Sequence, residues 1–209
     1  LGLSYARGEG VTPSHQQAEH WFRLAAEQGG AQAQNNLGLY CWYGCGISED
    51  IQQAIMWFRR AADQGYQTSQ YFLGKVLLEG LGVEKDLVEA SHWLKLSAEN
   101  GSAEAQNELG VAYEEGLLGK KDDEQALRFY HLAAEQNYVL AQYNLGLHYE
   151  SGNTKNGFEL ASHWYRLAAE NGYADAQLNL GELLLDKAVG LNENPDIVCS
   201  CLPMYKIFS

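Results

Sequence analysis

The residues of this chain that are best suited to bind a metal or attack a substrate are six histidines and four cysteines. His20, His92 and His163 recur at similar intervals, but Met56 and Arg128 stand at the same place in the two copies between them. Metal ligands must converge within coordination distance, and residues two copies apart do not converge. We therefore predict that the histidines lie on a solvated helix surface. They are His15, His20, His92, His131, His148 and His163.

The cysteines form two local pairs, Cys41 with Cys45 and Cys199 with Cys201. The first pair could bridge across a helix end, but Cys41 falls where a small buried side chain is expected. The second pair is too small a ligand set for zinc. We expect unpaired thiols in both places, and cysteine usage leaves the redox compartment open.

Catalytic patterns do not emerge from the other residues. No Ser-His-Asp, Cys-His or paired-carboxylate set has a spacing that brings its members together. The glycine segment at residues 8–10 and its copies are expected to end helices, so they are not interpreted as phosphate loops. The sequence thus predicts no enzymatic activity, no cofactor and no metal. The alternative of an enzyme acting on glycans would need convergent carboxylates that this spacing does not supply.

The elements that position these residues repeat along the chain. Leu-Gly dipeptides begin at residues 1, 37, 73, 109, 145 and 180, so that four intervals are 36 residues and the last is 35. An aromatic pair keeps step at residues 21–22, 57–58, 129–130 and 164–165, with Trp93 followed by Leu94 in the third copy. Repetition at this period predicts an all-α solenoid in which each copy packs on its neighbours.

Each copy is predicted to contain two helices joined by a glycine turn. The first, called the A helix, covers residues 31–43 in the second copy, with Leu37, Gly38 and Cys41 on one face. A glycine inside a helix costs about 1 kcal/mol relative to alanine. Its recurrence after each leucine therefore indicates the close approach of a neighbouring helix. The second, called the B helix, buries a stripe of alanines and aromatic rings.

The ends of the B helices also follow a pattern. Their predicted capping residues are Ser14, Asp50, Asp86 and Asp122. Glycine closes most of them, and Asn137 takes that place in the fourth copy. Two turns deviate: residues 117–121 read Leu-Leu-Gly-Lys-Lys, and a missing residue after Gly152 puts Gly157 in the capping place. We expect local loop adjustment at both, with the stack preserved.

These motifs together resemble the Sel-1-like repeat, a relative of the tetratricopeptide repeat. The resemblance is carried by Ala-x-Ala-Gln-x-x-Leu-Gly, a Tyr four residues after the Leu, Gly-x-Gly-Val, the acidic cap, Ala-x-x-Trp-Phe and Ala-Ala-Glu-Gln-Gly. It covers about residues 1–186. The tyrosine is replaced by Cys41, Leu77 and Leu184, and the disulfide of one subgroup is not matched in repeats three to five.

The resemblance implies a right-handed superhelix of antiparallel helix pairs that acts as an adaptor and has no shared enzymatic activity. Members of the family serve in signalling, in membrane-associated protein assembly and in contacts between bacteria and host cells. A bacterial extracytoplasmic or host-directed location is compatible with the resemblance, and the residues themselves leave the compartment open.

One flank of each A helix, opposite its core face, is the candidate binding surface, because A helices line the concave wall of stacked helix pairs. It holds rings, amides and carboxylates suited to a peptide with a basic segment. The alternative is that these residues make ordinary solvated or inter-repeat contacts. They are Asn35, Leu39, Trp42 and Tyr43 in the second copy; Tyr71, Lys75, Leu78 and Glu79 in the third; Asn107, Val111, Glu114 and Glu115 in the fourth; and Tyr143, Leu147, Glu150 and Ser151 in the fifth.

Composition limits the partners. The net charge of −13 over 209 residues disfavours nucleic acid and anionic membranes, and no stretch approaches the length of a membrane span. We expect a protein or peptide partner. The alternative function is a structural spacer or regulatory module within a larger multidomain protein, since the chain begins inside the pattern and is interpreted as a fragment.

The predicted repeat domain covers residues 1–186, with five helix pairs and a final A helix. Residues 187–209 diverge from the pattern and are apolar toward their end. We expect them to cap the last repeat, because a solenoid must cover its exposed apolar end. The alternative is that they occupy the groove of another copy and link chains by self-association.

Overall fold

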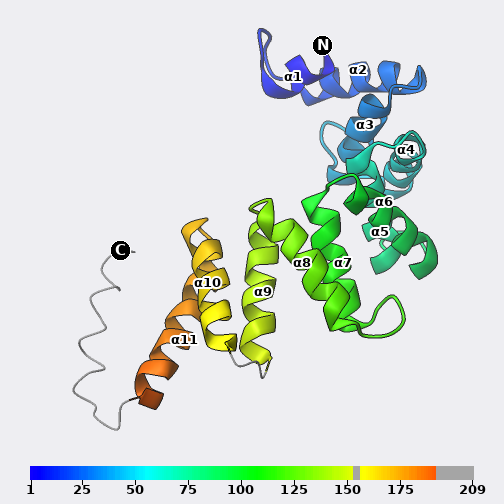
Figure 1. Cartoon of the computed structure of the whole chain (residues 1–209). Coiled ribbons are helices and arrows are strands. Elements are labelled where there is room, and N and C mark those ends of the chain that lie inside the picture. The colour runs from blue at the N-terminus through cyan, green and yellow to red at the C-terminus, as the bar shows by residue number, and fades with distance from the viewer. Residues whose placement is uncertain (153–155, 192–209) are drawn as a thin grey trace. The chain divides into compact units, whose positions relative to one another are not determined.

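A computed structural model describes residues 1–152 and 156–191, with side chains to residue 187, and every element in those ranges is an α-helix. Of the predicted C-terminal cap or link, residues 187–191 continue α11, and the rest, with Cys199 and Cys201, lies outside the described residues. Helices that follow one another in the chain pack together in pairs (Figure 1). The helices are α1 (Gly2–Arg7), α2 (His15–Glu27), α3 (Ala31–Tyr43), α4 (Ile51–Asp63), α5 (Gln67–Glu79), α6 (Leu87–Glu99), α7 (Ala103–Glu115), α8 (Asp123–Glu135), α9 (Val139–Ser151), α10 (Gly157–Glu170) and α11 (Ala174–Leu191).

The chain divides into two compact units, one of residues 1–129 and one that begins at Tyr130. We call them unit 1 and unit 2 and describe each by itself. In both units the odd-numbered helices are A helices and the even-numbered ones are B helices. The all-α solenoid predicted from the repeats is therefore confirmed.

The Leu-Gly face of the A helices forms the core, as predicted. Leu37, Leu73 and Leu109 are fully buried in unit 1, and Leu145 is fully buried in unit 2. The following glycine touches the B helix of its own pair: a Cβ built on Gly38 would lie 2.7 Å from two ring atoms of Phe58. The expected close approach of a neighbouring helix is thus confirmed, and it occurs within each pair.

The predicted helix ends are also confirmed, with one exception. The side chains of Ser14, Asp50, Asp86 and Asp122 each accept a hydrogen bond from the backbone N–H three residues later. Asn137, with φ of 62°, takes the left-handed conformation that glycine has at the other B-helix ends. The prediction for Gly157 was wrong by one residue: it is the first residue of α10, and Asn156 precedes it as the cap, without a side-chain bond.

A glutamine at the fourth position of the A helices α3, α5, α7, α9 and α11 ties each helix to the preceding B helix. The side-chain amide of Gln34 donates to the Ala26 carbonyl at 3.1 Å, and Gln70, Gln106, Gln142 and Gln177 repeat this bond to the carbonyl eight residues earlier. The side-chain oxygen of Gln34 in turn accepts a hydrogen bond, at 2.7 Å, from the side-chain amide of Gln64 at the end of the next B helix. One side chain therefore connects consecutive repeats.

We expect Gln34→Met to lower the free energy of unfolding by about 1–2 kcal/mol, because it removes a buried hydrogen-bonding amide while keeping the volume. Gln32→Met is the matched control, since Gln32 is exposed on the same helix and should change stability by less than about 0.5 kcal/mol. Urea unfolding followed by circular dichroism measures both. Equal losses in the two variants would contradict the connecting role of Gln34.

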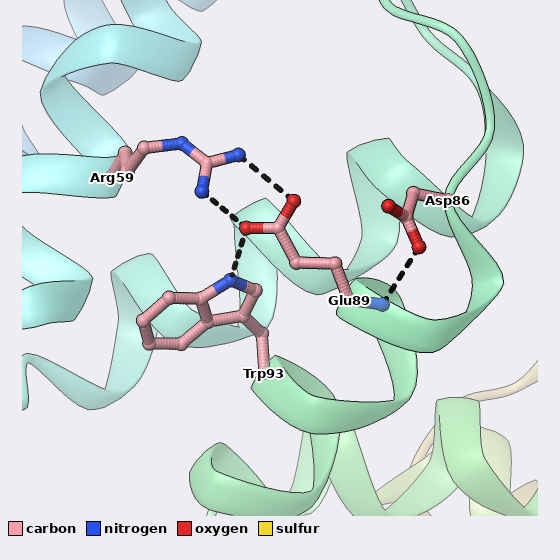
Figure 2. A network of polar contacts seen from close by, with 4 residues as sticks. All are labelled: Arg59, Asp86, Glu89 and Trp93. Atoms are coloured by element: carbon pink, nitrogen blue, oxygen red, sulfur yellow. Dashed lines mark hydrogen bonds and ion pairs between the residues drawn. The ribbon is translucent and has the colours of Figure 1, made fainter.

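A polar network joins the second and third repeats (Figure 2). The guanidinium of Arg59 on α4 donates to both carboxylate oxygens of Glu89 on α6, and the indole Nε1 of Trp93 donates to Glu89 at 3.0 Å. The hydrogen bond from Arg59, with that from Trp93, keeps the pKa of Glu89 below its usual value, although burial acts to raise it. The backbone N–H of Glu89 also donates to Asp86 at 2.9 Å. The network fixes the start of α6 against the preceding repeat.

Candidate functional site

A pocket lies between two neighbouring A helices of unit 1, α3 and α5. Its volume is about 240 Å³, and its lining residues are Trp42, Tyr43, Tyr71, Phe72, Lys75 and Val76. We call it the aromatic pocket. Trp42 and Tyr71 are half-buried and pack against the core of unit 1, whereas Tyr43 is 63% exposed. The pocket therefore combines fixed rings with one ring that is open to solvent.

Four of the six residues that line the aromatic pocket were predicted from the sequence, and the other two were not. Trp42, Tyr43, Tyr71 and Lys75 belong to the predicted set, but Phe72 and Val76 do not. The prediction treated each A helix alone, so it could not include positions that become pocket walls only beside another A helix. Phe72 also stacks on Phe58 with ring centroids 5.0 Å apart, which holds the pocket wall against the core.

The ammonium group of Lys75, which lines the aromatic pocket, is paired with carboxylates. The ammonium of Lys75 lies 2.8 Å from Glu108 on α7 and 3.5 Å from Glu79 on its own helix. Burial acts to lower the pKa of Lys75, but the hydrogen bond and charge of Glu108, with contributions from Tyr71 and Glu79, raise it above its usual value. Lys75 stays charged at neutral pH, and two carboxylates against one ammonium leave a local negative excess.

Carboxylates also end the neighbouring A helices. α5 ends at Glu79 and α7 ends at Glu114 and Glu115, and neither helix has a basic residue in its last turn. The carbonyl end of a helix already carries a partial negative charge, so acidic residues there are unfavourable for the helix itself. Glu79 and Glu115 are exposed, and Glu114 is half-buried. These ends favour a positively charged neighbour.

Three predicted residues are not on an open surface. Asn35 and Asn107 are 3% and 5% exposed, and Asn35 accepts a hydrogen bond from Ser69 of the next A helix at 2.9 Å. Leu78 is also buried. The expectation that the two amides are accessible to a peptide backbone is therefore wrong, because their position faces the adjacent repeat. Leu39 and Val111 are half-buried.

In unit 2, Tyr143 and Glu150 of the predicted residues belong to a network of tyrosines. The hydroxyl of Tyr165 donates to Glu150 at 2.5 Å, and the amide of Asn179 donates to the hydroxyls of Tyr143 and Tyr165. Burial, with the hydrogen bond to Glu150, raises the pKa of Tyr165 above its usual value. Glu150 therefore accepts a hydrogen bond from the buried Tyr165 through one oxygen and is still exposed. Leu147 and Ser151 are also exposed.

Among the residues that the structure describes, the histidines and cysteines do not assemble into a reactive site. His15, His20, His92 and His163 are exposed, as predicted, whereas His148 is half-buried, contrary to the prediction. The prediction was wrong for His131, whose ring is half-buried, lies 3.1 Å from the hydroxyl of Tyr149 and contacts the ring of Trp164. Burial lowers the pKa of His131, against the charge of Glu135.

Cys41 is fully buried, as its position predicts, and burial raises the pKa of its thiol. Cys41 and Cys45 are not bonded to each other. In the part of the chain that the structure describes, no three His, Cys, Asp or Glu side chains are grouped to hold a metal ion. None of the helices described there has the length and apolar character needed to cross a membrane.

The chain is similar to known repeat proteins in sequence and fold. The Sel1 repeat model matches residues 1–30, 31–66, 67–102, 103–138, 139–173 and 174–196. A protective antigen of uropathogenic Escherichia coli with an SLR fold is 35% identical, with a TM-score of 0.86 over 90% of this chain. This chain spans 40% of that antigen.

A Sel1 repeat protein from Oxalobacter formigenes is 32% identical, with a TM-score of 0.82, and the match covers all of this chain and 85% of that one. An immunity protein from Pseudomonas aeruginosa, 22% identical with a TM-score of 0.57 over 84% of this chain and 67% of its own, shares the fold alone. No match was found among curated proteins. The six matched repeats, and the agreement of their period with the helix pairs, establish that the chain belongs to the Sel1 repeat family.

Proposed function

We propose that this chain is a non-catalytic interaction module that binds a peptide or protein segment on the A-helix surface of unit 1. Sel1 repeat proteins are generally scaffolds for protein interactions, which supports the broad class. The observation that carries the specific proposal is the aromatic pocket, in which Tyr43 keeps 63% of its surface exposed beside the half-buried Trp42 and Tyr71. Exposed Tyr and Trp side chains are the commonest anchors of binding interfaces.

The charges around the pocket indicate which segment it would prefer. Lys75 is already neutralised by Glu108 and Glu79, and α7 ends in two further carboxylates. A segment with an aromatic or aliphatic side chain for the pocket and a Lys or Arg beside it would match both features. We propose Leu39, Val111 and Glu79 as flanking contacts. In unit 2, we propose Leu147 and Glu150, which are exposed, and Tyr143 as members of a separate contact surface.

We expect Tyr43→Ala and Tyr71→Ala each to weaken binding of a pocket-directed peptide about tenfold, because each removes part of an apolar anchor site. Short random peptides displayed on phage are selected on the immobilised full chain, and the enriched peptides are synthesised and titrated by fluorescence anisotropy. Met56→Ala on α4 is the control, since Met56 is 39% exposed and lies on a B helix.

The titrations decide between an interaction module and a spacer. The proposal requires that binding falls in both tyrosine variants and is unchanged in the Met56 variant, with equal helicity by circular dichroism. If the selection enriches no peptide, or if the enriched peptides bind all variants equally, the A-helix surface of unit 1 is not a binding surface. The spacer function would then be the better account.

A further inference from the structure

A second surface depression in unit 1 arises from a change in one turn. The turns after α3 and α5 read Gly-Cys-Gly-Ile (44–47) and Gly-Leu-Gly-Val (80–83), whereas the turn after α7 reads Gly-Leu-Leu-Gly (116–119). The second glycine has thus moved by one position, and Leu118 stands where Gly46 and Gly82 stand in the earlier repeats. The helix and turn lengths are otherwise the same.

That glycine is needed for close contact with the preceding B helix. A Cβ built on Gly46 would lie 2.8 Å from backbone and side-chain carbons of His15, and one on Gly82 would lie 2.5 Å from the side chain of Ile51. Leu118 has a side chain, so its backbone cannot approach the first turn of α6 so closely. A pocket of about 760 Å³ separates them, which we call the turn pocket. Its lining residues are Leu87, Val88, Ser91, His92, Lys95, Gly116, Leu117, Leu118 and Gly119.

The turn pocket has an apolar rim that is unusual for its position. Val88 is 84% exposed, Leu87 is 42% exposed and Leu117 is 39% exposed. In the other four repeats the place of Val88 is taken by Gln16, Gln52, Glu124 and Glu159, which are polar. A polar residue is the ordinary choice at an exposed helix start, so an exposed pair of aliphatic residues there favours contact with another molecule.

The charge at the turn pocket is opposite to that of the chain as a whole. Lys95 and His92 line it, and no carboxylate does. Arg59, the residue equivalent to Lys95, is paired with Glu89 of the next repeat (Figure 2), but Gln125 stands at the place of that glutamate one repeat later. Within the residues that the structure describes, Lys95 therefore has no ion pair. Lys120 and Lys121 of the same turn are exposed.

The carboxylates at the start of α6 keep their charge, but they are bonded to groups outside the turn pocket and do not line it. Glu89 is bound by Arg59 and Trp93, and Asp86 accepts the backbone N–H of Glu89. The net charge of the chain is −13, and Glu114, Glu115, Asp122 and Asp123 flank the turn, but the lining of the turn pocket itself holds Lys95 and His92 and no carboxylate. One kind of ligand, with both an apolar side chain and a negative charge, would match the apolar rim and the cationic lining.

We propose that the turn pocket binds an acidic segment of a partner protein, with a bulky aliphatic or aromatic side chain in the depression and Asp or Glu residues against Lys95 and the turn lysines. This is a second binding surface, formed by a B helix and a turn, and it does not depend on the aromatic pocket between α3 and α5. Apolar burial supplies most of the affinity, and the lysines select the sign of the flanking charges.

The test uses the full chain carrying Tyr43→Ala and Tyr71→Ala, so that the aromatic pocket is impaired. Random peptides displayed on phage are selected on this chain, and the enriched peptides are synthesised and titrated. We expect enrichment of peptides with Asp or Glu around Leu, Ile, Phe or Trp. We expect Leu87→Gln with Val88→Gln, and separately Lys95→Glu, to weaken their binding about tenfold or more. Arg7→Glu is the control, because it makes the same charge change at an exposed residue that does not line the pocket.

The outcomes separate this proposal from the first one. Acidic peptides that lose affinity in the Leu87/Val88 and Lys95 variants but not in the Arg7 variant support it, even if the aromatic pocket binds nothing. Enrichment of neutral or basic peptides, binding that is indifferent to the three substitutions in α6, or no enrichment at all would overturn it. Circular dichroism of each variant confirms that the helices remain folded.

Discussion

Replacing Phe58 with alanine is expected to lower the free energy of unfolding by about 3–5 kcal/mol, because the substitution leaves a cavity among residues that cannot close it. Phe58 is fully buried on α4. Its ring touches Gly38 of its own A helix, stacks on Phe72 of the next A helix and lies 6.4 Å from the ring of Trp42. One side chain thus contributes to the contact within a repeat and to the contact between repeats.

Met56→Ala is the matched control, since Met56 lies on the same helix and is 39% exposed. It should change stability by less than about 0.5 kcal/mol. Chemical unfolding followed by circular dichroism compares the two variants with the unchanged chain. A loss for Phe58→Ala no larger than that for Met56→Ala would mean that the second and third repeats are not held together through this ring.

Gly38→Ala is expected to be destabilising by about 2–3 kcal/mol, although the same change in an exposed helix normally stabilises by about 1 kcal/mol. The sign reverses because the added Cβ would lie 2.7 Å from two ring atoms of Phe58, which is fixed between Phe72 and Trp42. The A helix must shift away from α4, and the core contacts of both helices weaken.

A double-mutant cycle tests this cause directly. Once Phe58 is alanine, the space above Gly38 is open, so adding Gly38→Ala should cost nothing and should recover part of the helix propensity. Thermal unfolding of the two single variants and the double variant gives the coupling. Equal costs of Gly38→Ala in both backgrounds would show that the recurrent glycine has another purpose than close packing against the B-helix ring.

The repeat period and the core residues could be predicted because they depend on local pattern. Leu37, Gly38 and Cys41 lie on one face at helical spacing, and that face is buried whatever the partner helix is. The caps at Asp50 and Asp86 follow from their position before a helix. Such features need no knowledge of how one repeat rests on the next.

The opposite flank of the A helices was predicted less well because it depends on the neighbouring repeat. Angular spacing places Asn35 and Tyr43 on the same side, yet Asn35 is closed in by Ser69 and Tyr43 is exposed. Phe72 and Val76 were missed for the same reason, since they form pocket walls only beside α3. The stacking direction of the repeats decides which of these positions is open.

Two further roles could be recovered from the sequence by comparing positions in pairs. Glu150 and Tyr165 form a hydrogen bond where the second repeat has the apolar pair Trp42 and Phe58, so the two positions change character together. The recurrence of a glutamine at the place of Gln34 is the second signal, because the side chain of each copy binds the backbone carbonyl eight residues earlier. Both signals concern contacts between helices and not the period of one helix.

The most direct test of the proposed interaction surface is heteronuclear NMR of the isotope-labelled chain with a peptide selected on it. The peptide to be used is one whose binding is weakened by Tyr43→Ala. We predict that the largest amide shift changes lie in residues 39–46 of α3 and its turn and in residues 71–79 of α5, and that they disappear in the Tyr43→Ala, Tyr71→Ala variant. Shift changes spread over the B helices, or changes that persist in that variant, would contradict binding at the aromatic pocket.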